Sequence, residues 1–571
     1  MQFLSRYIPF FSWILTYNKS MFTNDFLAGL TVGIMLIPQG MAYAMLAGLP
    51  PEYGLYSALI PQVVYAFLGT SRQLAVGPVA MDSLLVASIV SALAANPDHY
   101  IDLAITLAFM MGALQFILGV LRFGFLVNFL SKPVISAFTF AAALIIGLNQ
   151  VKHLIGISFD KGSTTNTIQD LAIQVGKHFS ELNWVTVAIG ITGIIIIKVI
   201  KKINKQIPAA LVVVILGILT VYLFRLDLKG VKIVAEIPKG LPEFSIPNFS
   251  FDDFKALIPA SFILALIAFM EAISVAKAIE EKHSDYKVDA NQELIALGAS
   301  NFVGSFFKSY PGTGGFSRSA VSDQAGAKTG VAAIISALLI MFTLLFLTEY
   351  FWYLPKALLG SIIMVAVFGL IDLNVPKNLW KLDKIEFIIY TITFISTLTI
   401  GIQQGIGIGV LLSILFIIYN ASYPNIVVMG KVKGTNEYRN IERYPDAITS
   451  VDILIIRLDA RLFYANMNAL RDKIHQEIVD SNGSIKLVIL SGKAINSIDA
   501  SAIDMLQNLI KSLNNIGVEL YLTGFKGKVR DKLKLSGLAD TLLKNKCFLS
   551  VDSGIQFYRN KLIDETFIEK F

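Results

Sequence analysis

Apolar stretches about as long as a membrane is thick recur along the chain up to residue 420. A helix needs ~20 apolar residues to cross the hydrocarbon core of a bilayer, and each stretch has that length or is short enough to be one half of a pair. Across all 571 residues, 55% are hydrophobic and only 16% are charged. The sequence therefore predicts a polytopic α-helical membrane protein that carries a smaller soluble part.

Fourteen membrane spans are expected, seven in each half of this region. Lys and Arg gather in alternate loops, which predicts that both chain ends face the cytoplasm, although the loop at 225–252 contains several Lys and fits poorly. In the first half we expect spans at 26–48, one ending at 68, one beginning near 79, then 101–121, 124–148, 168–178 joined to 183–200, and 208–224. In the second half we expect them at 254–279, 290–307, 316–327, 330–348, 354–371, 384–400 and 403–420.

Two of these spans are interrupted by glycine and proline. The segment Lys308–Val321 contains Pro-Gly-Thr-Gly-Gly, so we expect an extended chain to Gly315 and a helix from Phe316 onward. In the first half, Gly77-Pro78 predicts the same change, with a helix beginning near Val79. Each break leaves free amide groups and the positive end of a helix dipole inside the membrane.

Arg318 follows the second break directly and is costly in a membrane unless it faces an anion or a carboxylate. Seven spans per half make the halves antiparallel, so the two half-helices would point their N-termini at each other near the midplane, where secondary transporters bind substrate. This arrangement predicts an anion site. The alternative is a Gly/Pro hinge whose Arg318 reaches a headgroup or pairs with Glu271.

Other polar residues in the apolar stretches are candidates for the same site. Gln39 and Tyr43 are four residues apart, so they share a helix face and could hydrogen-bond a ligand or a neighbouring helix. Asp82 and Ser83 lie in the first turn after Gly77-Pro78. Asp82 could be a structural carboxylate, a proton site or the counter-charge of Arg318.

Glu271 is a carboxylate within an apolar stretch. Burial disfavours its charged form while a nearby arginine favours it, so a site holding both can exchange a proton as an anion comes and goes. We therefore predict that Glu271 carries the coupling proton. The alternative is a static ion pair with Arg318 or Lys277.

Several classes of function are not supported by the sequence. The single cysteine, Cys547, excludes an intrachain disulfide, and the five His lack metal-ligand spacing. No long basic tract indicates nucleic acid, no phosphate-binding loop indicates a pump, and no nucleophile–base pair indicates an enzyme. We expect no cofactor and no metal. Gly405, Gly407 and Gly409 in the last span are expected to allow close helix packing.

Beyond Tyr423-Pro424 the pattern becomes that of a soluble α/β domain. Strands are expected at 452–458, 485–490 and 518–522, and amphipathic helices at 466–480 and 500–515. Asp499 precedes the second helix as a candidate N-cap, and Ser501 lies in its first turn. Capping explains both residues; phosphorylation of Ser501 is the alternative.

Four motifs carry a resemblance to a known family. Pro38-Gln-Gly-Met-Ala-Tyr, Pro51-Glu-Tyr-Gly-Leu-Tyr, Ala75-Val-Gly-Pro-Val-Ala and Gly315-Phe-Ser-Arg-Ser-Ala-Val resemble the SulP (sulfate permease) anion transporters. The C-terminal part is similar to a STAS domain. The resemblance implies a 7+7 inverted repeat in which a core domain of spans 1–4 and 8–11 moves against a gate domain of spans 5–7 and 12–14, in a homodimer.

The resemblance also implies site residues. Substrate would lie between spans 3 and 10, near Gln39, Tyr43, Val79, Ala80, Gly315, Phe316, Ser317 and Arg318. The set Glu271, Ser274 and Arg318 looks like that of proton-coupled sulfate members rather than sodium–bicarbonate members. Asp82 departs from many relatives, and the Asp-Ala-Ser-Ala sequence at 499–502 departs from the phosphorylated antagonists.

We therefore predict a secondary active transporter that takes up sulfate or a similar oxyanion with protons. The alternatives are a sodium-coupled bicarbonate or dicarboxylate transporter, and an uncoupled anion channel or sensor. We expect an integral protein of the cell (inner or plasma) membrane, in contact with lipid, with a possible cytoplasmic protein partner at the STAS domain. The expected parts are an amphipathic cytoplasmic segment (1–23), the two repeats (24–228 and 253–421), an extracytoplasmic linker (229–252) and a cytoplasmic STAS domain (425–571).

Overall fold

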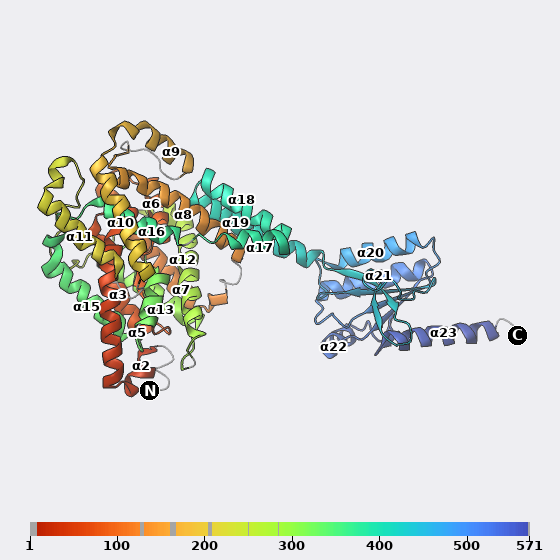
Figure 1. Cartoon of the computed structure of the whole chain (residues 1–571). Coiled ribbons are helices and arrows are strands. Elements are labelled where there is room, and N and C mark those ends of the chain that lie inside the picture. Colours follow the sequence, from red (N-terminus) through yellow and green to blue (C-terminus); the bar gives the residue numbers. More distant parts are fainter. Residues whose placement is uncertain are drawn as a thin grey trace. The chain divides into compact units, whose positions relative to one another are not determined.

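The computed structural model of the chain describes residues 8–125, 131–159, 167–203, 208–248, 250–283, 285–369 and 371–568. It divides into two compact units, Met1–Ser413 and Ile414–Phe571, which are treated separately below (Figure 1). Residues 1–7 of the expected amphipathic segment (1–23) therefore lie outside the described part of the chain.

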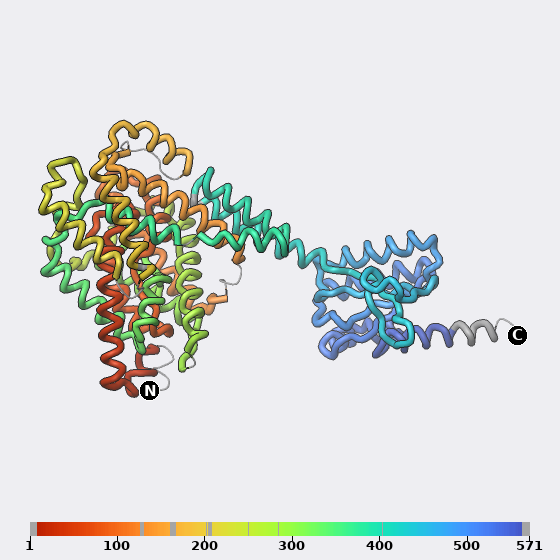
Figure 2. The backbone as a smooth tube through the Cα atoms, viewed as in Figure 1, coloured from red at the N-terminus to blue at the C-terminus, as the bar shows by residue number. Residues whose placement is uncertain are grey.

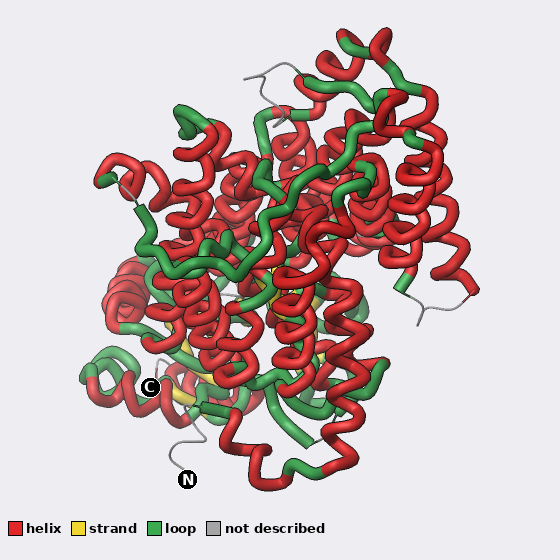
Figure 3. Tube along the Cα trace, turned by 90° about the vertical axis from the view of Figure 1, so that its left-hand side faces the viewer, coloured by secondary structure: helices red, strands yellow, loops and turns green. Residues whose placement is uncertain are grey.

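The first unit is built from helices, drawn red in Figure 3. In the described residues, six of the chain's helical segments are long and apolar enough to cross a membrane: Lys19–Leu46 (α3), Pro97–Val120 (α7), Lys132–Ile155 (α8), Phe251–Glu280 (α12), Val331–Phe351 (which begins with α15, Val331–Phe342) and Gln404–Ser422 (within α19, Ile402–Ser422). The shorter apolar helices are α6 (Ala80–Ser91), α10 (Trp184–Ile203), α11 (Ala209–Phe224) and α16 (Lys356–Phe368). The other α-helices of this unit are α2 (Phe10–Trp13), α4 (Pro51–Ser57), α5 (Ile60–Leu68), α9 (Ile168–Lys177), α13 (Ala290–Ser305), α14 (Phe316–Gln324), α17 (Asn374–Leu382) and α18 (Lys384–Thr399).

Some boundaries differ from those expected. The first helix begins at Lys19 rather than 26, because the Asn18 side chain accepts a hydrogen bond from the Met21 amide at 3.0 Å and caps it there. The expected second span, which follows Tyr56 and ends at Leu68, is the short helix α5, and the helix α4 before it was not expected. Helix α8 begins at Lys132 rather than 124, with Pro133 in its first turn. The amphipathic helix α17 was not expected.

Glycines allow several helices to approach closely. Helices α7 and α13 pack together, and a Cβ at Gly298 would lie 2.8 Å from the carbonyl oxygen of Gly112. Helix α3, red in Figure 2, lies against the green α15, and a Cβ at Gly33 would lie 3.3 Å from the backbone of Ser336. In α19 the expectation of close packing is confirmed for Gly405 and Gly409, which face Thr397 and Thr393, and is wrong for Gly407, which has open space.

Two short strands join the halves of this unit. Strand β1 (Val76–Gly77) pairs antiparallel with β2 (Thr313–Gly314), with Val76 opposite Gly314 and Gly77 opposite Thr313. Helix α6 follows β1 and α14 follows β2 within a few residues. Both expected changes from extended chain to helix are confirmed, because α6 begins at Ala80 and α14 at Phe316.

The second unit is a six-stranded sheet in the order β4-β3-β5-β6-β7-β8. Strands β5 to β8 are parallel and β3 is antiparallel to both of its neighbours. The expected strands and helices are confirmed as β5 (Ile453–Leu458), β6 (Leu487–Ser491), β7 (Glu519–Thr523), α20 (Met467–Asp480) and α21 (Ala500–Asn515). The elements that were not expected are β3 (Ile426–Lys431), β4 (Tyr438–Asn440), α22 (Gly527–Leu535), β8 (Cys547–Phe548) and α23 (Val551–Ile568).

This sheet has an apolar core on each face. Side chains of α20, α21 and α22, including Leu470, Leu506 and Val529, pack on one face. Tyr558 of α23 packs with Ile455 on the other. A sheet covered on both faces explains why its central strands are almost continuously apolar.

Candidate functional site

The guanidinium of Arg318 lies where the two broken helices meet. Its side chain is 1% exposed, and Nη1 donates a hydrogen bond to the carbonyl oxygen of Pro78 at 2.8 Å. Nε and Nη2 are buried and have no hydrogen-bond partner in the described part of the chain. An arginine has five N–H donors, so this one keeps most of its capacity for a ligand.

Both helix N-termini beside Arg318 are open. Val79 is the N-cap of α6 and Gly315 is the N-cap of α14, and neither supplies a side-chain cap. The amide groups of the first turn, which in α6 belong to residues from Ala80 onward, are therefore available to an anion. A Cβ at position 315 would lie 2.7 Å from Cζ of Arg318, so a larger residue there would displace the guanidinium.

Three polar side chains that the sequence did not single out hold the strands in place. Thr313 donates from Oγ1 to the carbonyl oxygen of Ala268 in α12. The side chain of Asn301 in α13 bonds both the amide and the carbonyl of Gly312, at 2.9 and 3.0 Å. Ser319 accepts from the Ala75 amide at 2.9 Å. In the sequence, Thr313, Asn301 and Ser319 could be recognised only as polar residues in helical or glycine-rich stretches.

Glu271 and Asp82 are unpaired carboxylates near this point. Oε2 of Glu271 and both carboxylate oxygens of Asp82 are buried without a hydrogen-bond partner among the described residues. Arg318 interacts electrostatically with Glu271, but no salt bridge joins them in the described structure. Lys277 pairs instead with Glu280, at 2.6 Å. The static ion pair considered for Glu271 is therefore absent from this structure.

Tyr43 and Tyr310 also interact electrostatically with Arg318. Tyr43 lies one turn after Gln39, whose Oε1 is buried without a partner in the described structure. The hydroxyl of Tyr310 lies 3.1 Å from Oγ of Ser83, which places Ser83 in a structural contact. Tyr310 was not predicted from the sequence.

A cavity of about 230 Å³ lies beside the site. Its lining includes Met81, Val134, Phe138, Glu271, Ser274 and Phe316, and we call it the Glu271 cavity. Phe316 is 61% exposed, and the neighbouring Ser317 is exposed as well. Ligand could therefore reach the first turn of α14 from this side.

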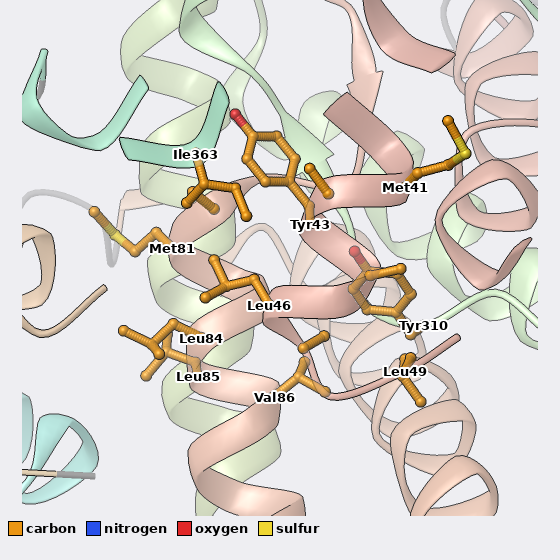
Figure 4. Close-up of a cluster of buried hydrophobic side chains, with 14 of the residues drawn as sticks. Met41, Tyr43, Leu46, Leu49, Met81, Leu84, Leu85, Val86, Tyr310 and Ile363 are labelled. Atoms are coloured by element: carbon orange, nitrogen blue, oxygen red, sulfur yellow. The ribbon is translucent and has the colours of Figure 1, made fainter. Parts of the chain in front are cut away.

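The site borders a cluster of buried apolar side chains, some of which also line the Glu271 cavity (Figure 4). We call it the apolar plug, and its members include Leu46, Leu84, Leu85, Tyr310 and Ile363. Tyr43 and Tyr310, which interact electrostatically with Arg318, belong to the same cluster.

In the second unit, Asp499 caps α21 as expected. Its carboxylate accepts a hydrogen bond from the Ala502 amide at 2.8 Å. Ser501 lies exposed in the first turn of the same helix.

A bundle of apolar helices with a buried cation between two broken helices defines a membrane transporter, here carrying a soluble α/β domain. The sequence model of the sulfate permease family matches residues 22–393, and that of the STAS domain matches residues 444–554. The chain belongs to the sulfate permease family, as the motifs predicted, and is an integral membrane transporter rather than an enzyme.

Relatives and solved structures agree with this assignment. "Sulfate transporter 4.1, chloroplastic" of Arabidopsis thaliana is 39% identical over 567 residues, covering 96% of this chain and 82% of that protein. "High affinity sulfate transporter 2" of Stylosanthes hamata is 36% identical, covering 98% and 87%. The structure of the murine Solute Carrier 26 family member A9 anion transporter in the inward-facing state is similar with a TM-score of 0.91 and 28% identity, covering 98% of this chain and 95% of that one.

Proposed function

We propose that this protein is a secondary active transporter that takes up sulfate, or a similar oxyanion, together with protons by alternating access. The observation that carries the proposal is the buried guanidinium of Arg318, whose Nε and Nη2 have no partner in the described structure and which lies beside two uncapped helix N-termini. Relatives named sulfate transporters, at 34–39% identity, support sulfate as the substrate.

The anion would lie between the first turns of α6 and α14. Arg318 and the amide groups after Val79 and Gly315 would bind its oxygens, since a helix N-terminus and a guanidinium both favour tetrahedral oxyanions. Gln39 and Tyr43 would donate hydrogen bonds from α3. The exposed Phe316 and Ser317 would meet the anion as it arrives from the Glu271 cavity.

Glu271 would carry the coupling proton, with Asp82 as a second carboxylate that could share it. A carboxylate buried without a hydrogen-bond partner is more stable when protonated, and an anion on Arg318 would cancel the positive charge that holds Glu271 ionised. Anion and proton would then bind together. Ser274 lines the same cavity and could bind water or, in a sodium-coupled protein, a cation.

We also propose the fourteen-span inverted repeat with its core and gate domains. Its support is that helix contacts come in equivalent pairs: α3 packs on α15 as α12 packs on α7, and α13 packs on α7 as α15 packs on α5. The same proposal includes a homodimer and a location in the cell membrane with both chain ends in the cytoplasm. It also includes a protein partner or a modification at the exposed Ser501. The proposed domain limits are 24–228, 229–252, 253–421 and 425–571.

The test of substrate is radiolabelled sulfate uptake by the full chain in proteoliposomes. Arg318→Ala should lower uptake roughly 100-fold or more, because two hydrogen bonds to a charged ligand are lost. The exposed Lys381→Ala is the control and should transport like the wild type. Unchanged uptake by Arg318→Ala would contradict the assigned site.

The test of coupling compares uptake driven by an inward proton gradient, by an inward sodium gradient, or by neither. Proton-driven accumulation should disappear in Glu271→Gln, because glutamine cannot bind and release a proton, while exchange of bound anion persists. Sodium-driven uptake would favour the bicarbonate or dicarboxylate alternative, and flux without any driving ion would favour a channel.

A further inference from the structure

A second polar pocket lies apart from the site described above. It has a volume of about 120 Å³, and its lining includes Ser91, Tyr100, Asn149, Gln150, Lys152 and His153. We call it the Gln150 pocket. It adjoins a larger cavity of about 670 Å³ that shares Gly48, Ser91 and Tyr100 and adds Lys356.

Two amide side chains in this pocket are buried without partners. Gln150 is 2% exposed and Asn149 is 7% exposed, and Oε1 and Oδ1 have no hydrogen-bond partner in the part of the chain that the structure describes. Buried polar groups are normally satisfied, because leaving one unpaired costs as much as losing a hydrogen bond. These unpaired oxygens are acceptors and cannot bind an oxyanion, but each amide also carries an NH2 group with two donors, through which the side chain can bind one.

The charge of the pocket selects an anion. Lys152 lies over the ring of Phe159, with Nζ 5.1 Å from the ring centroid, and makes no salt bridge to a described residue. Lys356 lines the adjoining cavity. The described residues that line these two cavities include no Asp or Glu. A concave surface that is lined by positive charges and has walls of low dielectric constant concentrates anions.

The Gln150 pocket is separate from the Arg318 site. Helix α6 connects the two, because Ala80 begins the helix at the site and Ser91 ends it at the pocket. At 1.5 Å per residue, these ends are ~16 Å apart. The apolar plug fills the space between them, with Met81 lining the Glu271 cavity and Leu46 lining the Gln150 pocket.

We propose that the Gln150 pocket is a second oxyanion-binding site, located across the apolar plug from the Glu271 cavity. Lys152 supplies the charge, and Asn149 and Gln150 supply hydrogen bonds. Its volume is several times the ~30 Å³ that one water occupies, which leaves room for a tetrahedral oxyanion. We assign this site the role of holding substrate before the apolar plug opens. That role rests on the proposed transport function, whereas anion binding at the site does not.

The experiment is equilibrium binding of radiolabelled sulfate to the purified full chain in detergent. The wild type should show two classes of site. Lys152→Gln and Gln150→Leu should each weaken one class at least about tenfold, through loss of a charged or buried hydrogen bond, and leave the other class unchanged. Lys152→Arg should restore most of the lost affinity, which separates a binding role from a folding defect, and the exposed Lys381→Gln should change nothing.

Arg318→Ala distinguishes the two proposals. If it removes one class and leaves the class sensitive to Lys152→Gln, both sites stand. If Arg318→Ala removes all binding and the pocket variants change none, the second site is overturned while the Arg318 site stands. If Lys152→Gln removes all binding and Arg318→Ala removes none, the pocket stands and the proposed substrate site fails. In uptake assays the pocket variants should raise KM and leave kcat unchanged.

Discussion

At the scale of single residues, the geometry of Arg318 depends on a missing side chain. A Cβ at position 315 would lie 2.7 Å from Cζ and Nη2 of Arg318, closer than any real contact. We expect Gly315→Ala to displace the guanidinium and lower sulfate uptake roughly tenfold or more, since small misplacements at a binding site are costly. Gly407→Ala is the matched control, because no atom lies within 4 Å of its Cβ. Equal uptake by both variants would contradict this account.

Sequence reasoning reached Arg318 but not its support. The breaks at Gly77-Pro78 and Gly312–Gly315 were predictable because the backbone restrictions of Gly and Pro are local properties. Asn301 and Ser319 were not, because each forms a hydrogen bond to the residue just before a strand, and only the folded chain brings that residue near. Whether Glu271 would be paired was also undetermined, since that depends on distances between helices rather than on spacing along one.

At the scale of elements, close packing of α7 on α13 depends on glycine. A Cβ at Gly298 would contact the Phe116 amide and lie 2.8 Å from the carbonyl oxygen of Gly112. Gly298→Ala should force the helices apart and lower the thermal unfolding midpoint in detergent by several degrees, as overpacking costs about 1–3 kcal/mol. Gly176→Ala in α9 meets no atom within 4 Å and should leave the midpoint unchanged.

Element boundaries show where sequence patterns were sufficient. Helices with strong apolar or amphipathic periodicity, such as α20 and α21, were placed within a residue or two. Strand β4 and helix α17 were missed because they are short, with three and nine residues, and a pattern repeated over so few residues is ambiguous. Helix α4 was missed because it has only seven residues, one of them Gly54, and it ends in a turn at Ala58 and Leu59 before α5 begins.

At the scale of the whole molecule, the STAS-containing unit Ile414–Phe571 has its own core on both sheet faces, so residues 414–571 should fold alone. Lys431 of β3 donates to Asp552 of α23 at 2.8 Å and fastens that helix to the sheet. This hydrogen bond lowers the pKa of Asp552 below its ordinary value and outweighs the opposing effect of burial.

A carboxyl group with a lowered pKa in the folded state binds protons more tightly when unfolded. Its contribution to stability is therefore complete above the unfolded pKa of about 3.9 and is lost as the pH falls through the lower pKa of the folded state. In urea unfolding followed by circular dichroism, Asp552→Asn should be less stable than the wild type at pH 7, and the difference should shrink as the pH falls below about 4. The exposed Asp531→Asn, which has no ion pair within the described unit, should follow the wild type throughout. A constant difference between Asp552→Asn and the wild type from pH 7 to 3 would mean that this carboxylate acts through packing rather than through its charge.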